Sequence, residues 1–401
     1  MLVENLPSPF DRRVWQEACA LRDAGYVVSI ICPTGAGCEK RFEAIDSIHI
    51  HRYSLPVEAS GAVGYALEYG AALAVDIRAR LARAPHARLR RHPRLQPARP
   101  VLPRRPVVQA AREEVRVRPP RSRPELYEAK FGRRDFFYRL MLKLERWTFR
   151  SADVSIATNE SYKRIAIERG RMAPERVFVV RSGPSLGRLK ILPPDERLKR
   201  EPSLSRRLRR ASWAGRRGST TCCSAARHIV LELGRSDVHF GLVGGGTSLE
   251  EMKALAVELG VADHVTFTGR VPDAEMLAML NTAEVCVNPD VANDMNDKST
   301  MNKIMEYMAL GKPIVQFDLT EGRWSARRAS LYARRNDPVD LAAKIVELLD
   351  DPARRAEMGE YGRRRVEDEL EWRHEAPKLL AAYAALGRGA APRARRLWLE
   401  T

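Results

Sequence analysis

Residues 298–318, KSTMNKIMEYMALGKPIVQFD, form the segment whose residue types and spacing point most directly to chemistry. A helix that begins near Ser299 or Thr300 would present unpaired backbone N–H groups and the positive end of its dipole, which suit a diphosphate. Glu306 would lie two turns further along, where its carboxylate can accept hydrogen bonds from both hydroxyls of a ribose. The same spacing fits an ordinary amphipathic helix with Glu306 in solvent. The pattern alone does not decide between these interpretations.

Two shorter motifs carry weaker signals. Gly244, Gly245 and Gly246 follow the apolar run VHFGLV, so they lie where a strand would end. Glycine allows a backbone to approach a ligand closely, although it is also common in structural turns. The cluster Asp11, Arg12 and Arg13 precedes a helical pattern. It fits either a helix N-cap with solvated arginines or a set of charges that faces a cleft, and spacing cannot separate the two.

Helical and strand patterns alternate along the chain. In the first half, strands are expected at 26–32, 48–53, 154–157 and 177–180, and helices at 13–25, 136–149 and 162–169. In the second half, strands at 238–243, 265–268, 285–288 and 313–317 alternate with helices at 249–259, 274–280 and 301–310, and further helices follow at 339–349, 354–370 and 379–386. Strands separated by helices form parallel, doubly wound sheets. Ligands bind such sheets at the carboxyl ends of the strands.

Length and cysteine usage limit the class of protein. A chain of 401 residues is too long for one ordinary core, so two domains are expected. Its longest apolar runs fall short of the roughly 18 residues that a membrane-spanning helix needs. The six cysteines form no CxxC pair, which argues against a zinc site or a disulfide framework and favours a reducing cytoplasm.

The net charge of +18 is concentrated in two arginine-rich blocks. Residues 78–124 contain 15 Arg, no Lys and two acidic residues, and residues 201–228 contain seven Arg and one acidic residue. The rest of the chain is nearly neutral. A basic arm for nucleic acid is one interpretation, but 78–124 holds no Phe, Tyr or Trp on which bases could stack. We therefore expect no nucleic-acid partner.

Several segments, in their order along the chain, resemble glycosyltransferase family 4, the group 1 glycosyltransferases. They are PFDRRVWQEACALRDAGYVVSIIC, SADVSIATNESYK, ERVFVVRSGP, the stretch 240–290 that begins FGLVGGG, KIMEYMALGKPIVQFD and the C-terminal LEWRHEAPKLLAAYAAL. Together they hold 131 of the 401 residues, and they are spread along the chain from residue 9 to residue 386. This shared order is more specific than any single motif.

The resemblance implies the α/β fold called GT-B. In this fold two Rossmann-like, doubly wound parallel-sheet domains face each other across a cleft, and a C-terminal helix crosses back to the N-terminal domain. We expect the N-terminal, acceptor-side domain at 1–181 and the nucleotide-sugar-binding domain at 182–368. The crossover helix is expected at 369–386 and a tail at 387–401.

The resemblance also implies a function. Members of the family transfer a sugar, with retention, from a nucleotide-diphosphate sugar to a glycan or lipid-linked acceptor. A UDP-sugar is the donor that we expect, with no bound cofactor and no structural metal. The expected location is the cytoplasm, with peripheral contact at the inner face of the plasma membrane left open because 61–77 is apolar enough for a surface helix.

Carried over by position, the family's donor-binding residues fall in two groups. Glu306 is the ribose-binding acid, and Ser299, Thr300 and Met301 hold the backbone positions beside the phosphates and the sugar. Many members place a second acid eight residues before Glu306, and here that position is Lys298, with Asp297 beside it. This departure leaves the donor sugar open. It resembles a subgroup that builds surface polysaccharides of the cell envelope from N-acetylated sugars.

The second group lines the cleft. Gly244 to Gly246 approach the donor, and Arg270 and Val271 lie where the nucleobase packs against backbone. The family's cleft histidine would fall where this chain has Pro119 and Pro120. The resemblance therefore assigns no catalytic residue.

The two arginine-rich blocks coincide with missing parts of the family pattern. Codons can be chosen for residues 91–103 whose translation in the frame shifted by one base is VIHACNPPDLFF. In the same way, codons for residues 115–122 can be chosen whose shifted translation is FVFDHHD followed by Leu. We therefore expect 78–124 to be out of frame or disordered, and 201–224 to be out of frame. The alternatives are a decayed, inactive GT-B protein and a nucleic-acid-binding protein. An epimerase or phosphorylase of the same fold would need catalytic acids or a cofactor lysine that the sequence does not offer.

Overall fold

The structure is a computed structural model of the chain. It describes residues 1, 3, 7–35, 37–54, 116–117, 123–200, 209–214, 219–245 and 249–388. Two compact units are formed, Met1–Glu113 and Glu114–Thr401. Most of 78–124, with Pro119 and Pro120, and also 61–77, Gly246 and the tail beyond 388 lie outside the described residues.

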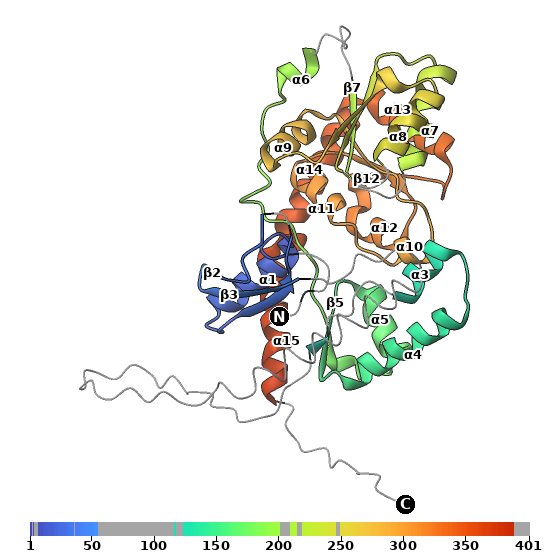
Figure 1. Ribbon diagram of the computed structural model, residues 1–401. Coiled ribbons are helices and arrows are strands. Elements are labelled where there is room, and N and C mark those ends of the chain that lie inside the picture. The colour runs from blue at the N-terminus through green and yellow to red at the C-terminus, as the bar shows by residue number, and fades with distance from the viewer. Residues whose placement is uncertain are drawn as a thin grey trace, which may run out of the picture. The chain divides into compact units, whose positions relative to one another are not determined.

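Within its described residues, the first unit contains a small sheet and a helix (Figure 1). Its strands are β1 (Ser29–Pro33), β2 (Phe42–Ile45) and β3 (Ile48–Tyr53), in the order β1-β3-β2. β1 pairs with β3 in parallel, and β2 pairs with β3 antiparallel. Helix α1 (Arg12–Asp23) is capped by Asp11, whose side chain accepts hydrogen bonds from two backbone N–H groups of the first turn. Such a cap fixes where the helix starts.

The second unit begins with a parallel sheet in the order β4-β5-β6. Its strands are β4 (Arg116–Val117), β5 (Val154–Ala157) and β6 (Val177–Val179). Between them lie the helices α3 (Arg123–Phe131), α4 (Phe136–Ser151), α5 (Glu160–Glu168) and the short η1 (Pro174–Arg176). β5 is buried at all four positions, as its apolar sequence predicts for a parallel strand.

The same unit continues with a six-stranded, entirely parallel sheet in the order β12-β11-β10-β7-β8-β9. The strands are β7 (Arg209–Ala214), β8 (Val238–Val243), β9 (Val265–Gly269), β10 (Val285–Asn288), β11 (Ile314–Phe317) and β12 (Ser330–Ala333). β7 lies in the middle, between β8 and β10, although it falls inside the second arginine-rich block. Strand β12 and the helices beside β7 were not predicted from the sequence.

Helices cover both faces of this sheet (Figure 1). One core contains side chains of α7 (Ser219–Arg227), η3 (His228–Glu232), α8 (Leu249–Glu258) and α13 (Pro338–Asp350). The other contains side chains of α9 (Asp273–Thr282), α11 (Asn302–Ala309), α12 (Thr320–Ala326) and η6 (Val366–Leu370), and α14 (Pro352–Arg365) packs beside α11. The remaining short elements are α6 (Glu196–Arg200), η4 (Ala262–His264), α10 (Asp294–Asp297) and η5 (Arg327–Ala329).

Neighbouring residues of β10 alternate between the two cores. Val285 and Val287 belong to one core and Cys286 to the other, and all three are fully buried. This alternation is the period of two expected of a strand that is covered on both faces. The sheet is therefore doubly wound, as the sequence predicted.

The last helix, α15 (Trp372–Arg388), contacts β5 and β6 of the three-stranded sheet. The chain thus returns from the six-stranded sheet to the other sheet of the same unit. The sequence pattern predicted a helix only from residue 379, but the helix begins at Trp372 and includes Pro377 in its second turn. Because proline has no N–H, this helix lacks the backbone hydrogen bond that residue 377 would otherwise donate to the carbonyl of residue 373.

Candidate functional site

Two loops meet at the carboxyl edge of the six-stranded sheet. The backbone N–H of Gly244, directly after β8, donates to the carbonyl of Gly269 at the end of β9, at 2.9 Å. Gly244 has a φ of +138°, and a Cβ on Gly245 would lie 3.4 Å from the backbone nitrogen of Arg270. The positive φ favours glycine at position 244, whereas a Cβ at position 245 would meet Arg270 at an ordinary van der Waals distance. The structure therefore brings Gly244, Gly245 and Arg270 together, as a shared ligand site requires.

Helix α11 begins close to the same edge without a side-chain cap. Met301 occupies its N-cap position and makes no side-chain hydrogen bond to the first turn. By contrast, Asn293 caps α10 and Asp337 caps α13 through side-chain oxygens. An uncapped N-terminus offers its N–H groups and its positive dipole end to an anion. The predicted start near residue 299 or 300 was early by two or three residues.

Glu306 lies on α11, and its side chain is 28% exposed. Its Oε1 accepts a hydrogen bond from Nη1 of Arg188 at 3.3 Å, and Nε of Arg188 donates to Asp273 at 2.8 Å. Burial alone would lower the pKa of Arg188, but the hydrogen bond to Asp273 and the charge of Glu306 outweigh it and raise that pKa. The guanidinium therefore links the predicted ribose acid to the start of α9.

Sequence reasoning missed Arg188 and Asp273. Arg188 lies in a stretch without a recognisable motif, 118 residues before Glu306. A pair so distant in sequence leaves no periodic signal, so only the folded chain reveals it.

The hydroxyls of Ser299 and Thr300 are turned into the protein. Ser299 is 6% exposed, and its Oγ donates to the carbonyl of Met295 at 2.5 Å. Oγ1 of Thr300 accepts a hydrogen bond from Nδ2 of Asn159 at 3.0 Å. Both hydroxyls are therefore hydrogen-bonded within the protein, and the backbone role that the resemblance implies for these residues stays a prediction.

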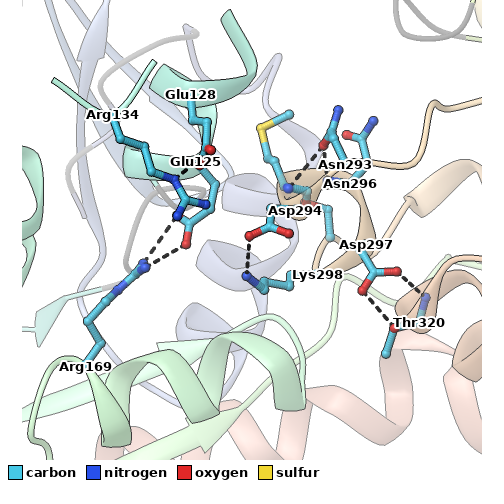
Figure 2. A network of polar contacts seen from close by, with 12 residues as sticks. Glu125, Glu128, Arg134, Arg169, Asn293, Asp294, Asn296, Asp297, Lys298 and Thr320 are labelled. Carbon is cyan, nitrogen blue, oxygen red and sulfur yellow. Dashed lines mark hydrogen bonds and ion pairs between the residues drawn. The ribbon is translucent and has the colours of Figure 1, made fainter. Parts of the chain in front are cut away.

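Lys298 and Asp297 have separate roles in the structure (Figure 2). The ammonium of Lys298 lies 3.4 Å from Asp294, within the same turn of chain. The carboxylate of Asp297 instead accepts hydrogen bonds from the backbone N–H and the hydroxyl of Thr320, at 3.0 and 2.9 Å, and also pairs with Arg335. Asp297 therefore holds the start of α12.

A buried ion pair lies under the first turn of α11. Nζ of Lys303 is 2.9 Å from Asp290, and their side chains are 14% and 2% exposed. Asp290 follows β10, so the pair joins the carboxyl end of that strand to α11. Removing one partner would leave a buried charge uncompensated.

A second polar cluster lies where α3 contacts α10 (Figure 2). Arg169 forms ion pairs with Glu125 and Glu145, at 2.7 and 2.5 Å. Burial opposes the charge of Arg169, but the hydrogen bonds to the two glutamates dominate and raise its pKa. Arg134 pairs with Glu128 at 2.7 Å on the exposed side. These contacts position helices and show no group available for chemistry.

The cluster at Asp11 lies in the first unit and acts as a helix cap. Asp11 is 7% exposed, accepts from the backbone of Arg13 and Val14, and pairs with the guanidinium of Arg13 at 3.0 Å. Burial raises its pKa, but the hydrogen bonds and charge of Arg13 outweigh burial, so the pKa of Asp11 is lowered. Arg12 is the first residue of the helix and is exposed.

Comparison with known proteins gives a consistent result. Residues 210–351 match the family described as glycosyl transferases group 1. The chain is 28% identical over 255 residues to a 2-deoxystreptamine glucosyltransferase of Streptomyces kanamyceticus, covering 61% of this chain and 63% of that protein. It is 30% identical over 225 residues to a GDP-mannose-dependent alpha-(1-6)-phosphatidylinositol monomannoside mannosyltransferase of Mycolicibacterium smegmatis, covering 50% of this chain and 57% of that protein. The matched part thus spans less than two thirds of either relative.

Solved structures agree on the fold. Sucrose-phosphate synthase from Thermosynechococcus elongatus superposes with a TM-score of 0.67 at 16% identity, covering 95% of this chain and 94% of that chain. HepE from Anabaena, solved in complex with UDP-glucose, superposes with a TM-score of 0.66 at 14% identity, covering 96% and 98%. The chain therefore has the GT-B fold, and its second half is similar to group 1 glycosyltransferases. Among the described helices, none is long and apolar enough to cross a membrane.

Proposed function

We propose that this protein is a retaining glycosyltransferase that moves a sugar from a nucleotide-diphosphate sugar to a glycan or lipid-linked acceptor in cell-envelope polysaccharide synthesis. The observation that carries the proposal is the uncapped start of α11 with Glu306 on the same helix. Both lie in the unit whose carboxyl edge brings the glycine turn at Gly244 next to Arg270. We also propose the domain limits 1–181 and 182–368, followed by the crossover helix at 369–386 and the tail.

Each part of the donor has a matching group in this arrangement. The diphosphate accepts hydrogen bonds from the backbone N–H groups at the start of α11, whose dipole supports the charge of the leaving group. The carboxylate of Glu306 accepts from the ribose hydroxyls, and the backbone at Arg270 and Val271 packs against the base. Catalysis would rest on positioning and on stabilisation of the departing diphosphate. No side chain is assigned as a nucleophile or a base.

A UDP-sugar is the donor that we propose, with an N-acetylated hexose as the sugar. The complex of HepE with UDP-glucose supports uracil as the base of the donor. The mannosyltransferase that is similar to this chain is named for GDP-mannose, which is the competing choice of donor. In many members of the family a second acid holds the hydroxyls of the donor sugar, and this chain has Lys298 at that position. This difference supports a donor sugar other than the one that those members use.

A surface of α4 supports peripheral contact with the inner face of the membrane. Four large apolar side chains on one stripe of this helix are 38–70% exposed: Phe136, Leu140, Leu144 and Trp147. Four basic residues on the same helix are also exposed: Arg139, Lys143, Arg146 and Arg150. An apolar stripe beside basic residues suits an anionic lipid surface. A lipid-linked acceptor would be presented at such a surface.

The direct test is a donor screen. Purified protein would be incubated with UDP-glucose, UDP-N-acetylglucosamine, UDP-N-acetylgalactosamine and GDP-mannose, and release of the nucleoside diphosphate would be measured with and without polyprenyl-phosphate-linked acceptors. We expect release with one UDP-sugar and a faster rate with acceptor. If UDP and GDP both fail to bind in calorimetry, the proposal is refuted.

The arginine-rich blocks need a separate test, because we propose that 78–124 and 201–224 are out of frame. Sequencing of the gene across codons 76–126 and 200–230 would decide this. A shifted frame that restores VIHACNPPD and FDHHD would supply the missing cleft histidine, and the corrected protein would then be assayed in parallel. A confirmed frame would favour the decayed, inactive alternative.

A further inference from the structure

The loop that precedes α11 is held by side chains of the three-stranded sheet. Asn159 and Arg181 each lie two residues after a strand, β5 and β6 respectively, so the carboxyl ends of two paired strands place both side chains at one edge. Both are buried, at 0% and 4% exposure. They reach residues 298–300, which lie more than 110 positions away along the chain. All of these residues belong to the same compact unit.

Asn159 makes the central contacts. Its Nδ2 donates to the carbonyl of Lys298 at 2.9 Å and to Oγ1 of Thr300 at 3.0 Å. Its Oδ1 accepts from the backbone N–H of Tyr162 at 2.8 Å and so caps α5. One side chain therefore begins one helix and fixes the loop that begins another.

Two further contacts complete the arrangement. The hydroxyl of Tyr162 lies 2.8 Å from Oγ of Ser299. Arg181 donates to Oγ1 of Thr300 at 3.3 Å and pairs with the buried Glu321 at 3.4 Å. Each residue of the loop 298–300 is thus hydrogen-bonded to a side chain of α5 or of the segments that follow β5 and β6. Buried bonds of this kind favour a single loop conformation, because an alternative would leave polar groups unsatisfied.

We propose that Asn159 and Tyr162 are positioning residues for the donor diphosphate. They fix the loop 298–300, which in turn sets where the first N–H groups of α11 lie. This inference rests on the proposed function, since it takes the start of α11 as the diphosphate site.

The loop before α11 and the body of α11 are held by different contacts, so the inference predicts different effects on the phosphate and ribose positions. The body of the helix is held by Ile304, Met305 and Met308, which are at most 1% exposed within a core that does not include Asn159. Glu306 lies on this body. Loss of the loop contacts should therefore disturb the phosphate position while leaving the ribose position in place.

The test compares nucleotides that differ only in phosphate number. Asn159→Asp keeps the oxygen that caps α5 and removes both donated hydrogen bonds. We expect the Kd of UDP to rise about tenfold, as the loss of one or two buried hydrogen bonds implies. The Kd of uridine should change less than about twofold by the same reasoning. Tyr162→Phe should raise the Kd of UDP about threefold, because one bond of the set is lost.

Asn293→Asp is the matched control. Asn293 caps α10 through Oδ1 in the same manner, so this variant adds the same charge in the neighbouring segment and keeps its cap. It should leave the ratio of UDP to uridine affinity unchanged. Amide hydrogen exchange at residues 298–303 gives a readout without nucleotide, and we expect faster exchange in Asn159→Asp than in the control.

The outcomes separate the two proposals. Wild-type protein that binds neither UDP nor GDP refutes the proposed function and this inference with it. Wild-type binding with an unchanged ratio in Asn159→Asp, or an equal loss of UDP and uridine affinity, overturns the inference alone. A control variant that behaves like Asn159→Asp overturns it as well, because the effect would then be one of charge.

Discussion

Replacement of Glu306 by glutamine is the sharpest test of the donor site. The substitution keeps the size of the side chain and one acceptor oxygen, but it removes the charge and one acceptor. A hydrogen bond to a charged group contributes about 1.5–3 kcal/mol. Because the carboxylate is 28% exposed and already interacts with Arg188, we take a net loss near the lower part of this range. A loss of about 2 kcal/mol corresponds to about a thirtyfold rise in Kd.

Isothermal titration with UDP and with uridine is the assay. Both ligands carry the ribose, so Glu306→Gln should weaken both by a similar factor. The free energy of unfolding should fall by less than about 1 kcal/mol, since the pair with Arg188 is partly exposed and worth little. A thermal melt in the absence of ligand checks that the variant is folded.

Asp273→Asn is the matched control for Glu306→Gln. Asp273 shares the same guanidinium, at 2.8 Å, and undergoes the same loss of charge. Its affinity for UDP should stay within about threefold of wild type, a difference below 0.7 kcal/mol or so. Unchanged binding by Glu306→Gln would refute the ribose assignment. An equal loss in both variants would show that Arg188, rather than the carboxylate of Glu306, contacts the donor.

Three further predictions concern residues outside direct donor contact. Asp297→Asn should lower the free energy of unfolding by about 1 kcal/mol, through a weaker helix cap, and leave the Kd of UDP unchanged; a large loss of affinity would contradict the structural role. Arg169→Met should cost about 3–5 kcal/mol in urea unfolding, because buried carboxylates lose their partner, and adding Glu125→Gln should recover part of this loss. Burial raises the pKa of the Cys286 thiol to about 12. This thiol should react with a disulfide reagent at pH 8 only on unfolding, whereas the partly exposed Cys38 should react in the native state, and equal rates would contradict the burial.

Much of the second unit could be predicted from the sequence, because its strands and helices carry strong local patterns. β8 and β10 were predicted at their observed limits, and β5 likewise. Most of their residues are apolar, as strands covered on both faces require, although each strand also contains one buried polar residue: His239, Asn288 or Ser155. A glycine turn after β8 was also expected, and Gly244 has the positive φ that favours glycine.

The central strand β7 was not predicted. Its sequence, RRASWA, lacks an apolar run, and its place is set by parallel pairing with β8 and β10. Pairing of this kind involves backbone groups from distant segments. A local window of sequence does not contain that information, so propensity and periodicity could not reveal this strand.

The sequence by itself determined the alternation of strands and helices in doubly wound sheets and the helix that carries Glu306, and its resemblance to the group 1 glycosyltransferases implied the GT-B fold. The alternation and the helix depend on local propensity and on the spacing of apolar residues, which are properties of short segments. Only the tertiary structure decided which partners the polar side chains have. Asp297 caps α12, Arg188 pairs with Glu306, and Asn159 holds the loop before α11. These contacts join segments 23 to 139 residues apart, and hydrogen bonds form by distance in space rather than by separation along the chain.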